Sequence, residues 1–328
     1  MNTTRAHLQQ QLDPARVTQL TYDLVSIPSP TGDSRRVTEF YADRLRELGL
    51  AVEFGEEYPQ SPSVVAYLEG GHPGPTVELS GHLDVIPVAH DPPEIREGVI
   101  YGRGTSDMKG GMAAVLEVTR VLAAVQDQLH GRLMVCAYGL HEAPVGRGEG
   151  LSGLLQRGIV GDAAISVEGP LDEVPVIGKG MSTYEIVVER PGVPIHEVHA
   201  APDLPHPLLI GLEVAQALRA WNEELSRGED LPYVGPETVF IGQFESGDFY
   251  NRVPNRCRIV GTRRYAPDVR FPEVEAEFQA RLDPIRARTS AEIRLDLVKT
   301  KDGFRVSEDE PIVKMLQQGY EEVTGQPL

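Results

Sequence analysis

The spacing of apolar residues predicts that helices and strands alternate in the first half of the chain. Helical spacing covers residues 14–25, 35–48, 110–125 and 151–157, and strand-like apolar runs cover residues 64–68, 76–80, 133–138 and 162–167. Strands that alternate with helices are typical of α/β folds. We therefore expect an α/β domain in which the strands run parallel.

The pattern changes after Pro170. Strands are predicted over residues 182–189, 238–244, 256–263 and 291–298, and helices over residues 207–225, 272–287 and 309–323. The order β-α-β-β-α-β before the last helix is typical of a small ferredoxin-like α+β sandwich. We expect an α/β domain over 1–171, an α+β domain over 172–299 and a return to the first domain over 300–328.

The chain is acidic, with 31 lysine and arginine residues against 49 aspartate and glutamate residues and a formal charge of −18. This charge disfavours sequence-independent DNA binding and docking on an anionic membrane. The N-terminal residues predict no signal peptide, and no apolar run is long enough to predict a membrane span. Its two cysteines, Cys136 and Cys257, cannot form a disulfide framework. We expect a cytoplasmic protein with no nucleic-acid or membrane partner.

Residues that can ligate a metal or transfer a proton follow the predicted strands of the first half. They are His82 and Asp84, Asp107 in a glycine-rich loop, His141 and Glu142, and Glu168. Each of them alone is an ordinary turn residue. In α/β sheets, however, sites form at the carboxyl ends of strands, so the four positions together predict a metal site. A phosphate-binding protein is the weaker alternative, because the loop over 101–111 matches neither GxGxxG nor GxxxxGK[ST].

Two motifs, SGHLDVIP (80–87) and YGRGTSDMKGG (101–111), together resemble the M20 family of metallohydrolases. That family includes acetylornithine deacetylase, succinyl-diaminopimelate desuccinylase, aminoacylase and carboxypeptidase. The resemblance implies a zinc-peptidase-like α/β catalytic domain interrupted by an α+β dimerisation domain, or lid. It also implies hydrolysis of the amide bond of N-acyl amino acids or short peptides by a metal-activated water. A homodimer formed through the lid and two Zn²⁺ ions per site follow as expectations, with Co²⁺ or Mn²⁺ as alternatives.

The resemblance also assigns roles around the metals. His82 is expected to bind one ion, and Asp84 to orient its imidazole. Asp107 is expected to bridge the two ions. Glu168 is expected to bind the same ion as His82.

The family has an adjacent Glu-Glu pair, of which the first is the catalytic base and the second a metal ligand. This chain has His141-Glu142 followed by Ala143 at the corresponding place. Either Glu142 is a ligand and His141 replaces the general base, or Glu142 is the base and a ligand is missing. Histidine and glutamate can both act as general bases. The spacing from Asp107 favours the first alternative.

The lid carries two further motifs. The segment GVPIH resembles the family motif GxxxH, so His196 is expected to reach the partner subunit's site and stabilise the oxyanion, with His199 as the alternative. The segment from 249 to 268 resembles the family's NxxP…R. This implies that Asn251 contacts the oxyanion or the substrate backbone and that Arg263 or Arg264 holds a substrate carboxylate.

The family's last histidine ligand lies beyond the segment that matches the end of this chain. The last histidine of this sequence is His206, and the sequence ends at Leu328. A shortened or degenerate relative, which binds a ligand or a metal without catalysis, is therefore the alternative to an active hydrolase. The number of metal ions per chain distinguishes the two.

Overall fold

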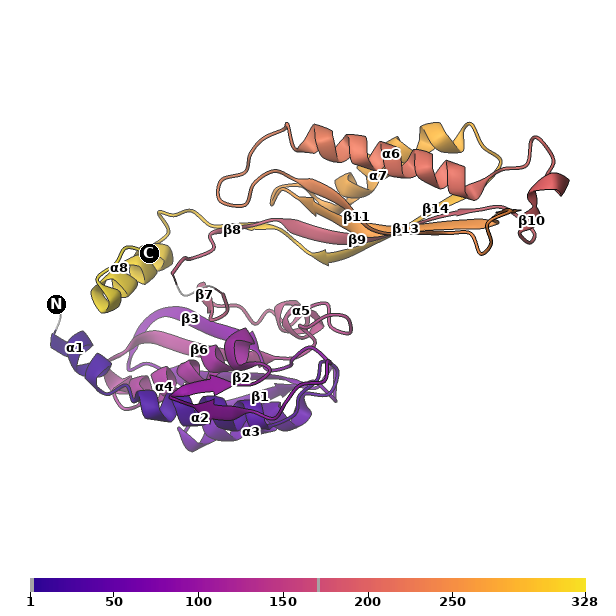
Figure 1. Ribbon diagram of the computed structural model, residues 1–328. Coiled ribbons are helices and arrows are strands. Elements are labelled where there is room, and N and C mark those ends of the chain that lie inside the picture. The colour runs from indigo at the N-terminus through magenta and orange to yellow at the C-terminus, as the bar shows by residue number, and fades with distance from the viewer. Residues whose placement is uncertain (1–2, 170–171) are drawn as a thin grey trace. The chain divides into compact units, whose positions relative to one another are not determined.

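A mixed five-stranded sheet organises the first of two units of the chain (Figure 1). The computed structural model describes residues 3–169 and 172–328, which divide into the units Met1–Asp172 and Glu173–Leu328. The strands of the first unit are β1 (Ala51–Gly55), β2 (Ser63–Glu69), β3 (His72–His82), β6 (His130–Tyr138) and β7 (Ala163–Ser166), with a separate hairpin of β4 (Glu94–Arg96) and β5 (Val99–Tyr101). Its helices are α1 (Thr3–Gln10), α2 (Pro14–Ser26), α3 (Arg35–Glu47), α4 (Gly110–Ala123) and α5 (Glu149–Gln156), with short turns at Thr105–Lys109 and Gln126–Gln128.

The sheet of the first unit lies between two layers of helices. Apolar side chains of α2, α3 and α4 pack with residues of β2 and β6 such as Val64 and Val135. On the opposite face, Val65 and Met134 pack against Leu154 of α5. Consecutive residues along β2 and β6 are therefore buried, as expected for a sheet covered on both sides.

The strand order is β1-β2-β6-β3-β7, and only part of the sheet is parallel as predicted. The strand β3 runs parallel to both of its neighbours, β6 and β7. The strands β1 and β2 are antiparallel to each other, and β2 is antiparallel to β6. The short connection between β1 and β2 explains their orientation, since a parallel pair needs a longer crossover.

The second unit has the predicted order β-α-β-β-α-β. Its main strands are β9 (Gly180–Glu189), β11 (Thr238–Ser246), β13 (Arg256–Tyr265) and β14 (Glu292–Lys301), and its main helices are α6 (Pro207–Leu225) and α7 (Phe271–Arg286). The antiparallel sheet has the order β11-β13-β9-β14. Both helices cover one face of it (Figure 1), where Trp221 and Phe278 meet in an edge-to-face contact in the core. This arrangement is a ferredoxin-like sandwich.

Short elements complete the second unit. They are β8 (Ile177–Gly178), β10 (Ile195–His196), the turn Glu197–His199, β12 (Arg252–Val253), β15 (Phe304–Arg305) and α8 (Pro311–Thr324). The strand β15 pairs with β8, and contacts within the chain group residues 300–328 with this unit. The return of 300–328 to the catalytic domain stays a prediction. Among the helices that the structure describes, none is long and apolar enough to cross a membrane.

Candidate metal centre

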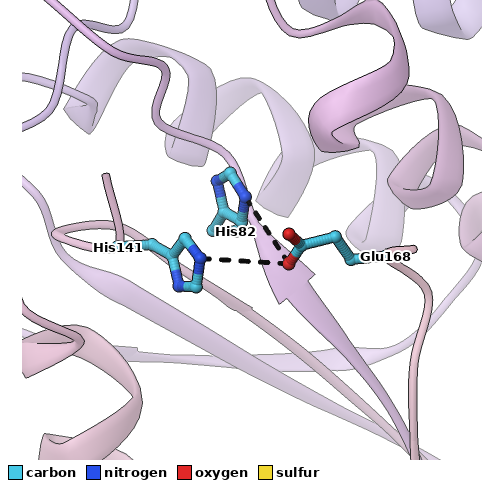
Figure 2. A group of neighbouring side chains, drawn as sticks. All are labelled: His82, His141 and Glu168. Carbon is cyan, nitrogen blue, oxygen red and sulfur yellow. Dashed lines mark ion pairs between the residues drawn. The ribbon is translucent and has the colours of Figure 1, made fainter. Parts of the chain in front are cut away.

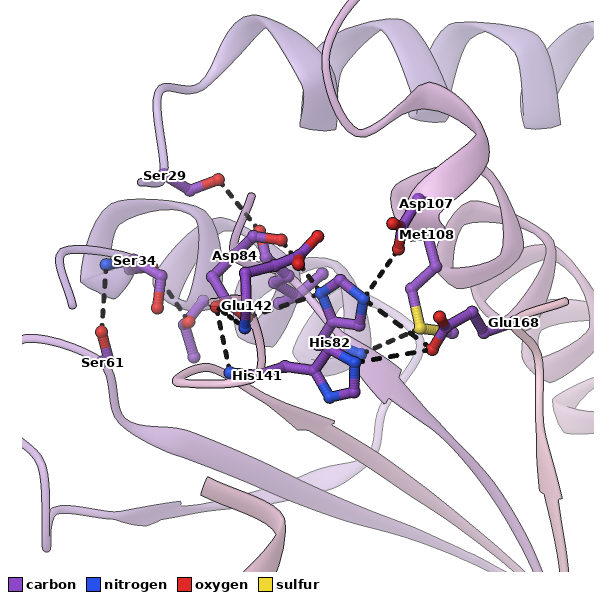
Figure 3. A network of polar contacts seen from close by, with 12 residues as sticks. Ser29, Ser34, Ser61, His82, Asp84, Asp107, Met108, His141, Glu142 and Glu168 are labelled. Atoms are coloured by element: carbon purple, nitrogen blue, oxygen red, sulfur yellow. Dashed lines mark hydrogen bonds and ion pairs between the residues drawn. The ribbon is translucent and has the colours of Figure 1, made fainter. Parts of the chain in front are cut away.

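Six predicted site residues meet at one edge of the first unit's sheet (Figure 3). His82 is the last residue of β3, His141 and Glu142 follow β6, and Glu168 follows β7. Because β3, β6 and β7 are parallel, their carboxyl ends lie at the same edge. Asp107 reaches this edge from the turn that precedes α4.

The imidazole of His82 is buried and is held from both sides. Its Nδ1 lies 3.0 Å from the carbonyl oxygen of Asp84, and its Nε2 lies 3.0 Å from Oδ1 of Asp107. The preceding residue, Gly81, packs closely on methionine side chains: a Cβ there would lie 2.2 Å from Cε of Met108, which would have to move. The backbone N–H of His82 donates to the sulfur of Met108 at 3.2 Å. These contacts aim Nε2 of His82 at the carboxylate of Asp107.

Asp84 connects the imidazole of His82 to the loop after β6. Its Oδ2 accepts hydrogen bonds from the backbone N–H groups of His141 and Glu142, both at 3.0 Å. Its Oδ1 is buried, lies 3.5 Å from Nδ1 of His82, and has no hydrogen-bond partner among residues 3–169 and 172–328. The position is suited to the predicted orienting role, because a metal ligand commonly donates its second ring N–H to a carboxylate.

The loop that carries the His-Glu pair is strained. Leu140 has φ of +57°, a conformation that costs a residue with a side chain about 1–3 kcal/mol. Its carbonyl oxygen accepts a hydrogen bond from the N–H of Gly148, which helps to hold the loop. Strain of this kind is typical of residues that a fold positions for function.

His141 and Glu168 form a second cluster around His82 (Figure 2). The two imidazoles are stacked, with ring centroids 4.2 Å apart and planes inclined by 11°. Oε2 of Glu168 lies 3.9 Å from Nε2 of His82 and 3.9 Å from Nε2 of His141. One carboxylate oxygen therefore faces both imidazoles.

The charges of the site shift the pKa values in opposite directions. Burial disfavours the protonated form of His82, but Asp84, Glu168 and Asp107 outweigh it and raise its pKa to about 9. Burial, and next the neighbouring charge of His82, hold the pKa of His141 below its usual value. Burial and the charge of Asp107 raise the pKa of Glu142. A neutral imidazole at His141 can therefore accept a proton at neutral pH.

The donor atoms fit divalent metal ions. The groups His82–His141–Glu168 and His82–Asp107–Glu142 each have their ligand atoms within 4.8 Å of one another. Imidazole nitrogen and carboxylate oxygen together are typical zinc ligands. Nδ1 of His82 faces Asp84, 3.0 Å from its carbonyl oxygen and 3.5 Å from Oδ1, so a proton on Nδ1 would leave Nε2 free to bind a metal.

Asp107 and Glu142 also face a hollow of about 540 Å³ within the first unit. Arg96 and Arg103 lie in its lining. Arg96 pairs with Glu94, whereas Arg103 has no hydrogen bond or ion pair within the part of the chain that the structure describes. Sequence reasoning missed Arg103, although a basic residue four positions before Asp107 in an acidic chain was a usable signal.

The structure also brings two predicted lid residues together. His196 in β10 and Asn251 beside β12 are neighbours because these strands pair, and Nδ2 of Asn251 lies 2.9 Å from Nε2 of His196. His196 is exposed and Asn251 is half-buried. His199 lies near them, with its ring centroid 5.9 Å from that of His196.

The two predicted carboxylate-binding arginines have different surroundings. Arg263 is fully buried and forms ion pairs with Glu237 and Glu277. Its guanidinium also lies over the ring of Trp221, 5.0 Å from the centroid. Arg264, the next residue of β13, is exposed. Of the two, only Arg264 has a guanidinium available to a ligand.

Comparisons with known proteins show the family of the chain. The sequence profile of peptidase family M20/M25/M40 matches residues 79–328. A succinyl-diaminopimelate desuccinylase from Methylobacterium radiotolerans is 29% identical over 334 aligned positions, which cover 95% of this chain and 82% of that enzyme.

Solved structures share the fold. A tripeptidase from Staphylococcus aureus superposes with a TM-score of 0.76 at 20% identity, covering 95% of this chain and 83% of that one. A Bacillus subtilis protein described as a dinuclear metal-binding peptidase superposes with a TM-score of 0.66 at 14% identity, covering 94% of this chain and 79% of that one. The predicted family resemblance and the predicted fold class are confirmed.

Proposed function

The chain belongs to peptidase family M20/M25/M40, and from this membership we propose that it hydrolyses N-acyl amino acids or short peptides that carry a free carboxylate. Metal-dependent amide hydrolysis is the activity of the family. The observation that carries the proposal is the convergence of Asp107, Glu142 and Glu168 on the buried imidazole of His82. The relatives are hydrolases, which argues against the alternative of a non-catalytic protein.

We propose that two zinc ions use this donor set. His82 and Glu168 would hold one ion, Glu142 the other, and Asp107 both. When bound, the ions polarise the substrate carbonyl and lower the pKa of a water molecule. Asp84 keeps the His82 imidazole in the orientation that presents Nε2.

We propose His141 as the general base. Its lowered pKa leaves the ring neutral at neutral pH, so Nε2 can take a proton from the attacking water and return it to the leaving amine. Asp84 positions the ring indirectly, because it binds the backbone N–H groups of His141 and Glu142. Glu142 as the base is the alternative, and its raised pKa is compatible with that role.

The lid is proposed to supply the remaining groups. His196 and Asn251 would stabilise the oxyanion of the tetrahedral intermediate in the partner subunit's site, which makes a homodimer the functional form. Their mutual contact of 2.9 Å supports a shared role. The homodimer and the cytoplasmic location stay predictions.

Turnover by the zinc-supplemented protein tests the proposed function. Incubation with a panel of N-acyl amino acids and di- and tripeptides is expected to release free amino acid, at a rate that a chelator abolishes and added zinc restores. Matched substrates whose carboxylate is amidated serve as the control and should be poor. Absence of turnover on the whole panel, with zinc, cobalt or manganese, would contradict the proposal.

Replacement of Arg264 is expected to raise KM for substrates with a free carboxylate. A hydrogen bond to a charged group contributes about 1.5–3 kcal/mol, so Arg264→Ala should raise KM about tenfold or more. Arg103→Ala tests in the same way whether the hollow beside Asp107 holds the carboxylate instead. Steady-state kinetics with the free and amidated substrates separates the two, since only the true carboxylate ligand loses the preference for the free acid.

Arg263→Ala is the matched comparison for Arg264→Ala. It should act on stability, by about 3 kcal/mol, because it leaves Glu237 and Glu277 without the guanidinium between them. A urea melt measures this change. A larger KM effect for Arg263→Ala than for Arg264→Ala, with unchanged stability, would reverse the assignment.

A further inference from the structure

The paired strands β10 and β12, together with Asn251, form an arm of the lid. This arm continues the central strand pair of the lid, β9 and β13, after a break in the strand pairing. β9 and β13 pair as far as Glu189 and Arg256, and β10 and β12 pair from Ile195 and Val253 onward. Between them lie the segments 190–194 and 254–255. The geometry of this break decides where the arm is held relative to the sheet.

Prolines prevent a regular ladder at the break. Pro191, Pro194 and Pro254 have no backbone N–H, so they cannot donate to carbonyl groups across the gap. Gly192 turns the chain with φ of +87°, a conformation that favours glycine. The carbonyl groups of both segments therefore need donors from another source.

The side chain of Arg190 supplies those donors. Its Nε donates to the carbonyl oxygen of Pro254 at 3.2 Å, and its Nη2 donates to those of Val193 at 3.0 Å and Val253 at 3.1 Å. Its Nη1 donates to the carbonyl oxygen of Pro191 at 3.0 Å. One planar guanidinium thus joins both segments at the base of the arm.

The guanidinium of Arg190 has no carboxylate partner within the described residues, and the residue is only 3% exposed. Four carbonyl dipoles solvate it instead. Lysine could not replace this arrangement, because its ammonium is a point charge without the rigid fork of donors. Asn255 also stabilises the start of the arm. Its carbonyl oxygen accepts a hydrogen bond from the backbone N–H of Arg190, and its Nδ2 donates to the carbonyl oxygen of Gly192, both at 3.0 Å.

We propose that Arg190 is a positioning residue for hydrolysis, whose guanidinium fixes the arm that presents His196 and Asn251 to the substrate. The proposal rests on the proposed function, in which these two side chains stabilise the oxyanion. Arg190 does not touch the substrate. It acts through the angle and rigidity of the arm.

The test measures kcat at saturating substrate for Arg190→Ala, Arg190→Lys, His196→Ala and the double variant of Arg190→Ala with His196→Ala. A small displacement of a catalytic group can cost on the order of 10²-fold in rate, so both Arg190 variants should lower kcat by about that factor. Metal content should not change. In the His196→Ala background the further loss should be clearly smaller than in the wild type, because the arm then presents only Asn251.

Chemical rescue supplies a second readout. Arg190→Ala leaves a buried space lined by carbonyl groups, so millimolar guanidinium chloride should restore part of the lost kcat, whereas ammonium chloride at the same ionic strength should not. Rescue should be smaller when His196→Ala is also present. Arg258→Ala is the matched control, since Arg258 is a lid arginine that pairs with Glu185 and Glu245 away from the arm, and it should leave kcat unchanged.

The possible outcomes are distinguishable. If His196→Ala leaves kcat unchanged, the proposed oxyanion role fails and the Arg190 proposal fails with it. The second case is that His196→Ala lowers kcat. If the loss of kcat in Arg190→Ala is then absent, is additive with the loss in His196→Ala, or is not rescued by guanidinium, only the Arg190 proposal is overturned. Asn255→Ala, which removes one hydrogen bond, replaces Arg190→Ala if that variant does not fold, and it should show the same coupling to His196→Ala.

Discussion

Replacement of Asp107 by alanine is expected to abolish tight metal binding and hydrolysis together. Its carboxylate lies 3.0 Å from Nε2 of His82 and belongs to the group that includes Glu142. The side chain is 59% exposed, so the loss should not come from disruption of the core. Bound metal stabilises the transition state by several kcal/mol, so the rate should fall about 10³-fold or more when the metal is lost.

Metal analysis of the purified protein after zinc supplementation and dialysis measures the first effect, and turnover of the best substrate measures the second. Asp91→Ala is the matched control, because Asp91 lines the same hollow but belongs to neither ligand group. It should retain the wild-type metal content. Unchanged metal content in Asp107→Ala would show that the ligand assignment is wrong.

Replacement of the adjacent residues His141 and Glu142 is expected to separate catalysis from metal binding. His141→Gln should keep most of the metal and lower kcat by about 10²–10⁴-fold, the usual contribution of a general base. Glu142→Gln should lose about one metal ion per chain, since Glu142 lies with Asp107 and His82. His141→Glu, which restores the family's Glu-Glu pair, should recover activity that His141→Gln lacks.

The pH dependence gives an independent check of the same assignment. A base must be unprotonated to act, so kcat should hold above the pKa of His141 and fall as pH drops through it. Burial is the largest cause of the lowered pKa of His141 and does not depend on the charge of His82, so the fall should occur below the usual range for histidine. Loss of metal from His141→Gln, with metal retained and kcat lost in Glu142→Gln, would instead make Glu142 the base.

The fold could be predicted well where apolar periodicity was strong. The helix over 207–225 is found with those bounds as α6, and the β-α-β-β-α-β order is confirmed. The strand β1 was missed because Ala51–Gly55 is an edge strand in which only the last residue is buried, so its apolar signal is weak. The antiparallel orientation of β2 to β6 was missed because periodicity carries no information on strand direction.

The difference between Arg263 and Arg264 could have been predicted. In β13 the buried positions alternate, and Arg263 has the same parity as Cys257, Ile259 and Tyr265. A residue on the apolar face of a half-buried strand points into the core, so the sequence pattern already favoured Arg264 as the exposed one. A buried arginine also requires partners, which Glu237 and Glu277 provide from distant positions that no local pattern reveals.

The roles of His141 and Glu142 could not be predicted from the sequence in the same way. Adjacent residues in a loop have no fixed periodicity, and the stretch that follows them differs from the family motif. Their directions depend on Asp84, which is far away in the sequence and binds both backbone N–H groups. The structure places Glu142 with Asp107 and His141 with Glu168, a division set by tertiary contacts alone.

The spread of the ligands along the chain has a consequence for how the protein matures. His82, Asp107, Glu142 and Glu168 follow different strands or turns, and no two of them are close in sequence. No short stretch of the nascent chain can therefore hold an ion tightly. The edge of the sheet must form first, through the non-local pairing of β3 with β6 and β7. If these four residues bind metal as proposed, loading of the ions would follow the folding of the first unit.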